Sequence, residues 1–326
     1  MSLPDNFLAQ QAPSLRSVRL SNVHPAFDHF FPLPNLTELD MNLLEGTKPF
    51  RMGVLLQFFS DSPLLQRIHI KILVDTVQDI SPDHQVTSLD SLVEMNYSCK
   101  QASSILPFLR LPRLKKLFVS CSVGLGQVQK LADILPCDGH ALLAQTPRIW
   151  YNSDPHPRPI VLTLCGDGVR VTFHAFRTTA ETPVGGFVDW FSNQSAIQFS
   201  RVGELMIWDS PAVAGFHINV FALENLKILR TGRCDGQLAE EFLRPFRPVP
   251  GMGVPCRSLR EIGYTYQRTD GPLPTSLISL SKERKRAGYE LEHFLFAVAH
   301  ESDRDLVEEL REHVPEVQVT VWPART

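Results

Sequence analysis

A short pattern of apolar residues returns along the chain and restricts its fold more than any other feature. In residues 33–41 (LPNLTELDM), Leu39 and Met41 are two apart, so both face the same side of an extended strand. Leu36, three residues earlier, packs from the turn that leads into the strand. Pro34 marks the start, because proline blocks a preceding helix and is tolerated at the first residue of a strand. The pattern predicts one strand of a leucine-rich-repeat-like unit.

Apolar sets with the same spacing recur on both sides of this segment. The steps between neighbouring copies run roughly 21 to 33 residues, which overlaps the leucine-rich-repeat range. Strands joined in series by right-handed crossovers predict an α/β fold, a leucine-rich-repeat-like solenoid with a curved parallel sheet and irregular outer helices. The copies are Leu15, Val18 and Leu20; Leu65, Ile68 and Ile70; Leu92, Met95 and Tyr97; Leu114, Leu117 and Val119; Val202, Leu205 and Ile207; Leu226 and Leu229; Leu259, Ile262 and Tyr264; and Leu291, Phe294 and Phe296.

Between these strands the apolar spacing changes to a helical period. Helices are expected over residues 54–59, 128–135, 238–243 and 306–314, and proline ends the last two. We expect a single domain over residues 1–326, with N-terminal repeats over 12–121, an irregular insertion over 122–199 and C-terminal repeats over 200–326.

The insertion contains two alternating segments. Residues 160–164 and 169–173 alternate on either side of Gly166-Asp167-Gly168, which predicts a β-hairpin near 160–174. Residues 148–151 are expected to supply the sheet strand at this position. Two interpretations remain open. The insertion is either an enlarged repeat that extends the sheet or a dedicated binding element.

Composition excludes several classes of function. The net charge of −3 gives no global field for nucleic acid or anionic membrane, and no stretch is long and apolar enough to span a bilayer. The six cysteines form no C-x-x-C pair, which is typical of reduced thiols in the cytoplasm, with the nucleus as an alternative. Nucleophile elbows, phosphate loops and paired metal ligands are absent from the sequence, so we expect no catalytic, cofactor-binding or metal residues and no enzyme activity.

One basic run has two interpretations. Lys282, Arg284, Lys285 and Arg286 form either the charged outer face of a helix or a nuclear-import patch.

Candidate binding residues lie between the apolar anchors, on the strand face opposite the core. Stacking the repeats places Glu38, Arg67, Glu94 and Lys116 in one row of alternating sign, in which Glu38 is expected to pair with Arg67. Asp40 is then the acid that remains for a partner. Phe118, Met206 and Trp208 are candidate exposed anchors, unless the insertion covers them. The predicted protein-binding residues are Asp40, Arg67, His69, Asn96, Lys116, Phe118, Met206, Trp208 and Arg230.

Five phrases of the sequence are distinctive: APSLRSVRL at Ala12, LPNLTEL at Leu33, GQVQKLADILP at Gly126, GVPCRSLREI at Gly253 and LVEELREHVPEVQV at Leu306. Together they resemble the F-box-associated, leucine-rich-repeat-like proteins of mushroom-forming fungi. The resemblance implies a non-enzymatic scaffold like the substrate-recognition region of an F-box receptor in a cullin-RING ubiquitin ligase. Its expected partner is a protein or ubiquitylation substrate, with no nucleic acid and no membrane.

The F-box itself is expected to be absent, because the first repeat begins at Ala12 and leaves no room for that helical module before it. A Skp-type adaptor is therefore expected as a partner only if an F-box lies upstream. The alternative interpretation is a truncated or degenerate repeat protein without an independent biochemical role.

Overall fold

The chain is an α/β protein with mostly parallel β-sheet and few helices in the part that the computed structural model describes. It divides into two compact units. The first comprises Met1–Ala144 with Gly166–Phe176, and the second comprises Gln145–Cys165 with Arg177–Thr326. The described residues are 14–22, 33–44, 49–77, 79–80, 85–99, 105–124, 135–136, 147–152, 160–166, 169–176, 199–208, 220–232, 236–265, 275–298 and 304–321.

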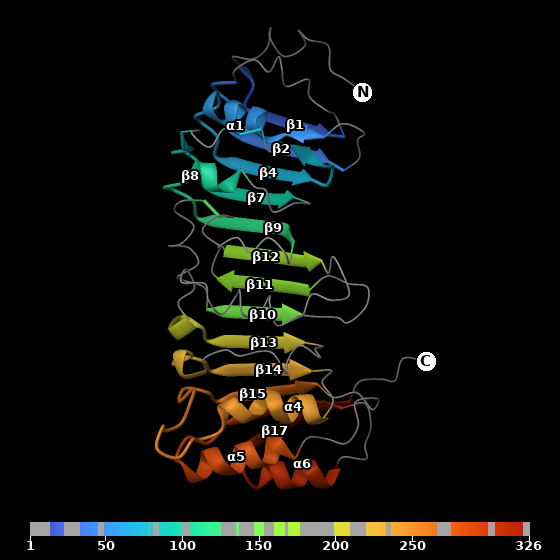
Figure 1. Cartoon of the computed structure of the whole chain (residues 1–326), viewed down its shortest axis with the longest axis vertical. Helices are drawn as coiled ribbons and strands as arrows, with labels where there is room; N and C mark the ends of the chain where they lie inside the picture. Colours follow the sequence, from blue (N-terminus) through green and yellow to red (C-terminus); the bar gives the residue numbers. More distant parts are fainter. Residues whose placement is uncertain are drawn as a thin grey trace, which may run out of the picture. The chain divides into compact units, whose positions relative to one another are not determined.

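The long strands of the first unit are all parallel, as the repeats predict. Each strand is in register with the next, so that Val18, Leu39 and Ile68 form one buried row. Along the sheet the order is β1 (Ser17–Ser21), β2 (Glu38–Leu43), β4 (Arg67–Ile72), β7 (Glu94–Cys99), β9 (Lys116–Gly124) and β12 (Val169–Phe176) (Figure 1).

A tight turn precedes seven of the described strands. The backbone N–H of Leu36 donates to the carbonyl of Leu33 at 3.0 Å, and β2 begins only at Glu38. Pro34 therefore occupies the second position of this turn, where its fixed φ is favoured, and the prediction that it starts the strand is wrong. The same bond joins Leu65 to Ser62, Leu92 to Leu89, Leu114 to Leu111, Val202 to Phe199, Leu226 to Leu223 and Leu259 to Cys256.

Short elements complete the first unit. The helix α1 (Met52–Ser60) buries Met52, Leu55, Leu56, Phe58 and Phe59, so the predicted helix is confirmed, although Val54 is only half-buried. The 3-10 helix η3 covers Leu106–Phe108, and two small parallel pairs join β3 (Phe50–Arg51) to β5 (Thr76–Val77) and β6 (Thr87–Ser88) to β8 (Leu109–Arg110). Of the helix predicted over 128–135, all but Leu135 lies outside the described residues.

The second unit repeats the parallel arrangement with one exception, since β11 runs antiparallel to β10. Its core includes Leu205, Leu229, Ile262 and Phe294, which are fully buried and in register. The order is β11 (Ile160–Gly166), β10 (Arg148–Asn152), β13 (Glu204–Trp208), β14 (Ile228–Gly232), β15 (Glu261–Thr265), β16 (His293–Val298) and β17 (Glu316–Val321).

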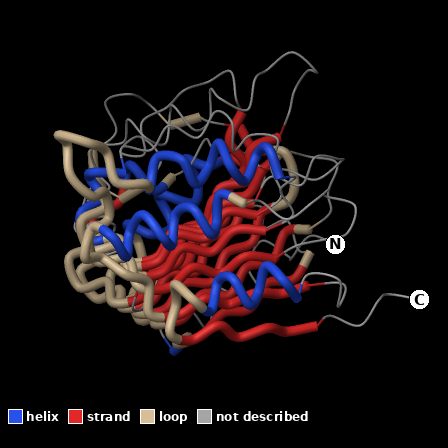
Figure 2. Tube along the Cα trace, turned by 90° about the horizontal axis from the view of Figure 1, so that it is seen from below, coloured by secondary structure: helices blue, strands red, loops and turns tan. Residues whose placement is uncertain are grey.

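Among the described residues of this unit there are three α-helices: α4 (Gly236–Leu243), α5 (Ser276–Arg286) and α6 (Arg304–Arg311). Helix α4 packs against α5, α5 packs against α6, and α6 packs against β17. Figure 2 shows the helices in blue and the strands in red. The 3-10 turns are η5 (Phe199–Arg201), η7 (Val220–Ala222) and η8 (Arg244–Phe246). None of the described helices is long and apolar enough to cross a membrane.

Some predictions about the insertion and the C-terminus are settled and others are not. Both alternating segments are strands, β11 and β12, and residues 148–151 do form a sheet strand. The turn residues Asp167 and Gly168 lie outside the described residues, so the hairpin itself stays a prediction. The strand β17 was missed. Val314, Val317 and Val319 have the same spacing as the apolar residues of the other repeats. Pro315, however, predicts the end of the preceding helix at this point and hides the start of a strand.

Candidate functional site

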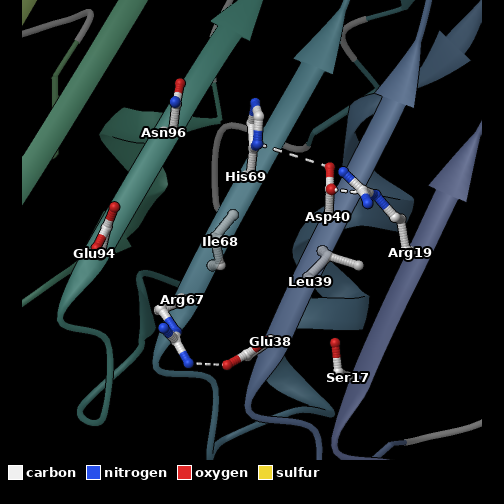
Figure 3. A pocket seen from close by; sticks show the side chains of 10 residues that line it. All are labelled: Ser17, Arg19, Glu38, Leu39, Asp40, Arg67, Ile68, His69, Glu94 and Asn96. Carbon is white, nitrogen blue, oxygen red and sulfur yellow. Dashed lines mark hydrogen bonds and ion pairs between the residues drawn. The ribbon is translucent and has the colours of Figure 1, made fainter.

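Polar side chains gather in a shallow groove on the face of the first unit opposite its core (Figure 3). The groove has a volume of about 380 Å³ and brings together four of the predicted binding residues, Asp40, Arg67, His69 and Asn96. They come from β2, β4 and β7, whose in-register pairing places alternate residues on one face. The other polar residues of the groove are Ser17, Arg19, Glu38 and Glu94.

The first row on this face is a ladder of opposite charges. The guanidinium of Arg67 donates through Nη2 to Oε1 of Glu38, which confirms the predicted pair. Further along the row, Nζ of Lys116 lies 3.6 Å from Oε2 of Glu94. Both pairs join adjacent strands, because in-register residues of parallel strands are close enough for long side chains to meet.

Arg19, Asp40, His69 and Asn96 form a second row on this face. Asp40 has more partners in this row than its sequence position suggests. Its Oδ2 lies 2.7 Å from Nε of Arg19, and its Oδ1 accepts a hydrogen bond from Nδ2 of Asn42 at 2.8 Å and lies 3.7 Å from Nδ1 of His69. Asp40 is therefore paired as Glu38 is, because Arg19 and His69 are its in-register neighbours on β1 and β4. A binding role for Asp40 itself stays a prediction.

The two charges of each pair differ in how far they reach into solvent. The side chains of Arg19, Arg67 and Lys116 are 78%, 65% and 57% exposed. Their carboxylate partners are less exposed, at 23% for Asp40 and 38% for both Glu38 and Glu94. In each of these three pairs the cation is therefore the more solvent-exposed member.

The predicted aromatic anchors are less prominent. Phe118 on β9 is half-buried, and its backbone neighbours are Asn96 and Arg170. Trp208 belongs to β13, but its side chain lies outside the described part of the chain. Their role as exposed anchors stays a prediction.

The remaining candidates, Met206 and Arg230, line a second groove of about 260 Å³ in the second unit. Arg230 lies between two carboxylates, with Nη1 3.7 Å from Oε1 of Glu204 and Nη2 3.1 Å from Oε1 of Glu261. Its stem crosses Gly263, where an added Cβ would lie 3.0 Å from Cγ of Arg230. Because Gly263 has no side chain, the stem of Arg230 has the space it needs to reach both carboxylates.

The sequence contained a signal for this network that was not followed. Glu204 and Glu261 directly precede the anchors Leu205 and Ile262, at the same offset as Glu38 before Leu39. Extending the charged row into the later repeats would have predicted both acids. Arg148 joins them, since its Nε lies 3.3 Å from Oε2 of Glu204.

The basic run on α5 is not a uniform charged face. Lys282, Lys285 and Arg286 are exposed, but Arg284 is completely buried. Its Nη1 donates to the carbonyls of Pro255 at 3.0 Å and Phe246 at 3.4 Å, and its Nη2 donates to that of Cys256 at 3.0 Å. Burial lowers the pKa of Arg284 to about 10. For this residue the outer-face interpretation is wrong, because the helix turns it toward the loop at residues 246–256.

The described residues offer little for covalent chemistry or metal binding. Cys99, Cys121, Cys165 and Cys256 are buried and form no disulfide bond within the described part of the chain. Burial raises the pKa of both Cys121 and Cys256 to about 12, which makes them poor nucleophiles. Among these residues no group of three or more His, Cys, Asp or Glu side chains is placed to hold a metal ion.

Comparisons with known proteins do not assign the chain to a class. The sequence matches no protein-family model. A search of curated proteins found no significant match either.

Proposed function

We propose that the chain is a leucine-rich-repeat-like solenoid over residues 1–326 and works as a non-enzymatic scaffold for protein–protein interaction. It would resemble the substrate-recognition region of an F-box receptor in a cullin-RING ubiquitin ligase. One observation carries the proposal: side chains from β1, β2, β4 and β7 meet in an open groove on the exposed sheet face. Repeat arrays commonly use such a continuous strand face for binding.

The form of this groove supports binding of a macromolecule better than binding of a small metabolite. Small-molecule sites are typically concave and mostly apolar, and they bury most of their ligand. Here the groove is shallow, and its polar residues include exposed Arg19 and Arg67 at 78% and 65% exposure. A long partner that touches several strands at once would use this surface more fully.

Affinity capture with matched variants tests the proposal. The full chain, immobilised under reducing conditions, is exposed to a native extract beside the double variant Arg67→Ala/Lys116→Ala and the control Lys282→Ala. Lys282 is an exposed cation on α5, in the second unit. We expect proteins that the parent and the control retain and the double variant loses. Identical retention by all three would reject the groove as the binding surface, and no retained protein would favour a degenerate repeat protein.

Membership of a ubiquitin ligase needs its own measurement. If this chain selects substrates, the same capture should be repeated with any longer gene product, and a Skp-type adaptor should be retained only by a product with an upstream F-box. Adaptor retention by the 326-residue chain alone would contradict the expectation that docking resides in that module.

A further inference from the structure

The charges on the face of the first unit are arranged to favour an acidic partner. In every pair described on this face the cation is the more exposed member, by 78% to 23% for Arg19 and Asp40 and by 65% to 38% for Arg67 and Glu38. An approaching ligand therefore meets guanidinium and ammonium groups first. A basic ligand would have to displace a cation from its carboxylate, whereas an acidic ligand would not.

The arginines keep hydrogen-bonding capacity while paired. A guanidinium has five N–H donors. The ion pair of Arg19 uses Nε, and that of Arg67 uses Nη2. Further N–H groups on each side chain remain for an incoming carboxylate, which guanidinium binds well through two parallel hydrogen bonds.

The spacing of the cations suggests the form of the ligand. Arg67 on β4 and Lys116 on β9 occupy the same row with β7 between them. Two strand intervals separate them by about 10 Å. A polyproline II segment has three residues per turn and rises about 3.1 Å per residue. Acidic residues three apart in such a peptide therefore share one face about 9 Å apart and would match these cations.

We propose that this face binds an acidic peptide segment in the polyproline II conformation that crosses the strands, with acidic side chains at every third residue paired to Arg67 and Lys116 and a further one reaching Arg19. This inference rests on the proposed scaffold function and narrows its partner. A nucleic acid fits less well, because its uninterrupted phosphates would approach Glu38, Asp40 and Glu94 as well as the cations.

Fluorescence anisotropy with labelled peptides tests the proposal on the full chain. The probe carries Glu at every third position; the comparison peptides carry Gln at those positions, the same number of Glu residues placed together, or Lys. We expect the spaced Glu peptide to bind best and to weaken as salt rises, because exposed charges are screened. Equal binding of the spaced and clustered peptides would overturn the spacing, and tighter binding of the Lys peptide or of a single-stranded oligonucleotide would overturn the acidic-peptide assignment.

Variants assign the binding to named residues. Arg67→Ala/Lys116→Ala should weaken the spaced Glu peptide by roughly tenfold or more, since both are charge-assisted contacts. Lys282→Ala removes one exposed cation from α5 and should leave the affinity unchanged. Arg67→Glu/Lys116→Glu should reverse the preference toward the Lys peptide. Unchanged affinity in both double variants, with native circular dichroism, would overturn the assignment.

The two proposals can fail separately. If protein capture depends on Arg67 and Lys116 but no acidic peptide binds, the scaffold function stands and the acidic-peptide inference is wrong. If neither capture nor peptide binding depends on these residues, both are wrong.

Discussion

Arg284 and Arg67 are both arginines, but the first side chain is buried and the second is exposed. Arg284, in the second unit, is fully buried and donates to the carbonyls of Phe246, Pro255 and Cys256. Arg67, in the first unit, is 65% exposed and paired with Glu38, which is itself 38% exposed. The buried arginine satisfies backbone carbonyls of buried residues, while the exposed one has a partner that solvent and salt screen. Burial, rather than charge, separates a cation that holds the fold from one that is available to a ligand.

Removing the buried cation should have the largest effect. We expect Arg284→Ala to lower the free energy of unfolding by about 3–5 kcal/mol, because buried carbonyl groups lose their donors and a cavity is left. Urea denaturation followed by circular dichroism measures this loss. Lys282→Ala, an exposed change on the same helix, is the control and should alter stability by less than about 0.5 kcal/mol.

Two results would contradict the role given to Arg284. A loss below about 1 kcal/mol would mean that the carbonyls find other partners. If Arg284→Lys kept full stability, donation from two separate nitrogens would be unnecessary, because a lysine ammonium has only one nitrogen.

The surroundings of Arg284 should also protect a thiol. Cys256 is buried beside it, and burial raises the pKa of this thiol to about 12. Compared with a thiol at the ordinary value of 9.0, it is ionised roughly a thousandfold less at pH 8, so iodoacetamide should modify it correspondingly slowly. Mass spectrometry of timed samples measures the rate, and urea-unfolded chain is the control.

The sign of the pH effect follows from the same shift. Because the folded-state pKa lies above the unfolded one, the neutral buried thiol contributes stability that is fully present below pH 9 and is lost as the pH rises toward 12. Rapid labelling of Cys256 at pH 8 in chain that remains folded would show that the Arg284 site is open to water.

The different surroundings of the two arginines also explain what the sequence could predict. The buried position of Leu39 and the Glu38–Arg67 pair follow from local rules, namely a period of two along each strand and the in-register stacking of identical spacings. Arg284 obeys no such rule. Its acceptors lie 28, 29 and 38 residues away in sequence, so its burial depends on a loop whose path the sequence pattern does not reveal.

Other errors have the same origin. Pro34 was assigned to the strand because the anchor spacing locates the strand but not the turn before it. Asp40 is expected to remain for a partner when ion pairing is considered only in the row of Glu38, whereas Arg19 and His69 in its own row lie beside it. In the second unit the ion pairs of Arg230 need the space that Gly263 leaves by having no side chain, and the pattern of apolar residues does not predict this.

The exposure of Arg230 is intermediate between those of Arg284 and Arg67, so disturbing its ion pairs should have an intermediate effect on stability. In Gly263→Ala the new Cβ would lie 3.0 Å from Cγ of Arg230, so the arginine side chain that pairs with Glu261 must shift slightly. We expect a loss of about 1 kcal/mol in the free energy of unfolding, measured by urea denaturation.

A double-mutant cycle isolates the cause of that loss. In an Arg230→Ala background, Gly263→Ala should cost nothing or slightly stabilise, because the crowded stem is gone and alanine orders the strand better than glycine. The same loss in both backgrounds would show that Gly263 is required for the backbone and not for Arg230.

The exposed ladder should contribute least to stability, which makes it the sharpest contrast with Arg284. Arg67→Ala should lower the free energy of unfolding by about 0–1 kcal/mol, because exposed ion pairs are screened and lose side-chain entropy when they form. Urea denaturation at low and high salt measures this, and the small difference from the parent should shrink as salt rises. Glu38→Gln is the matched control, since it removes the same pair from the other side. A loss above about 2 kcal/mol in either variant would mean that the ladder is part of what holds the sheet together. Its cations would then be structural like Arg284, and weaker peptide binding in Arg67→Ala would no longer identify a ligand contact.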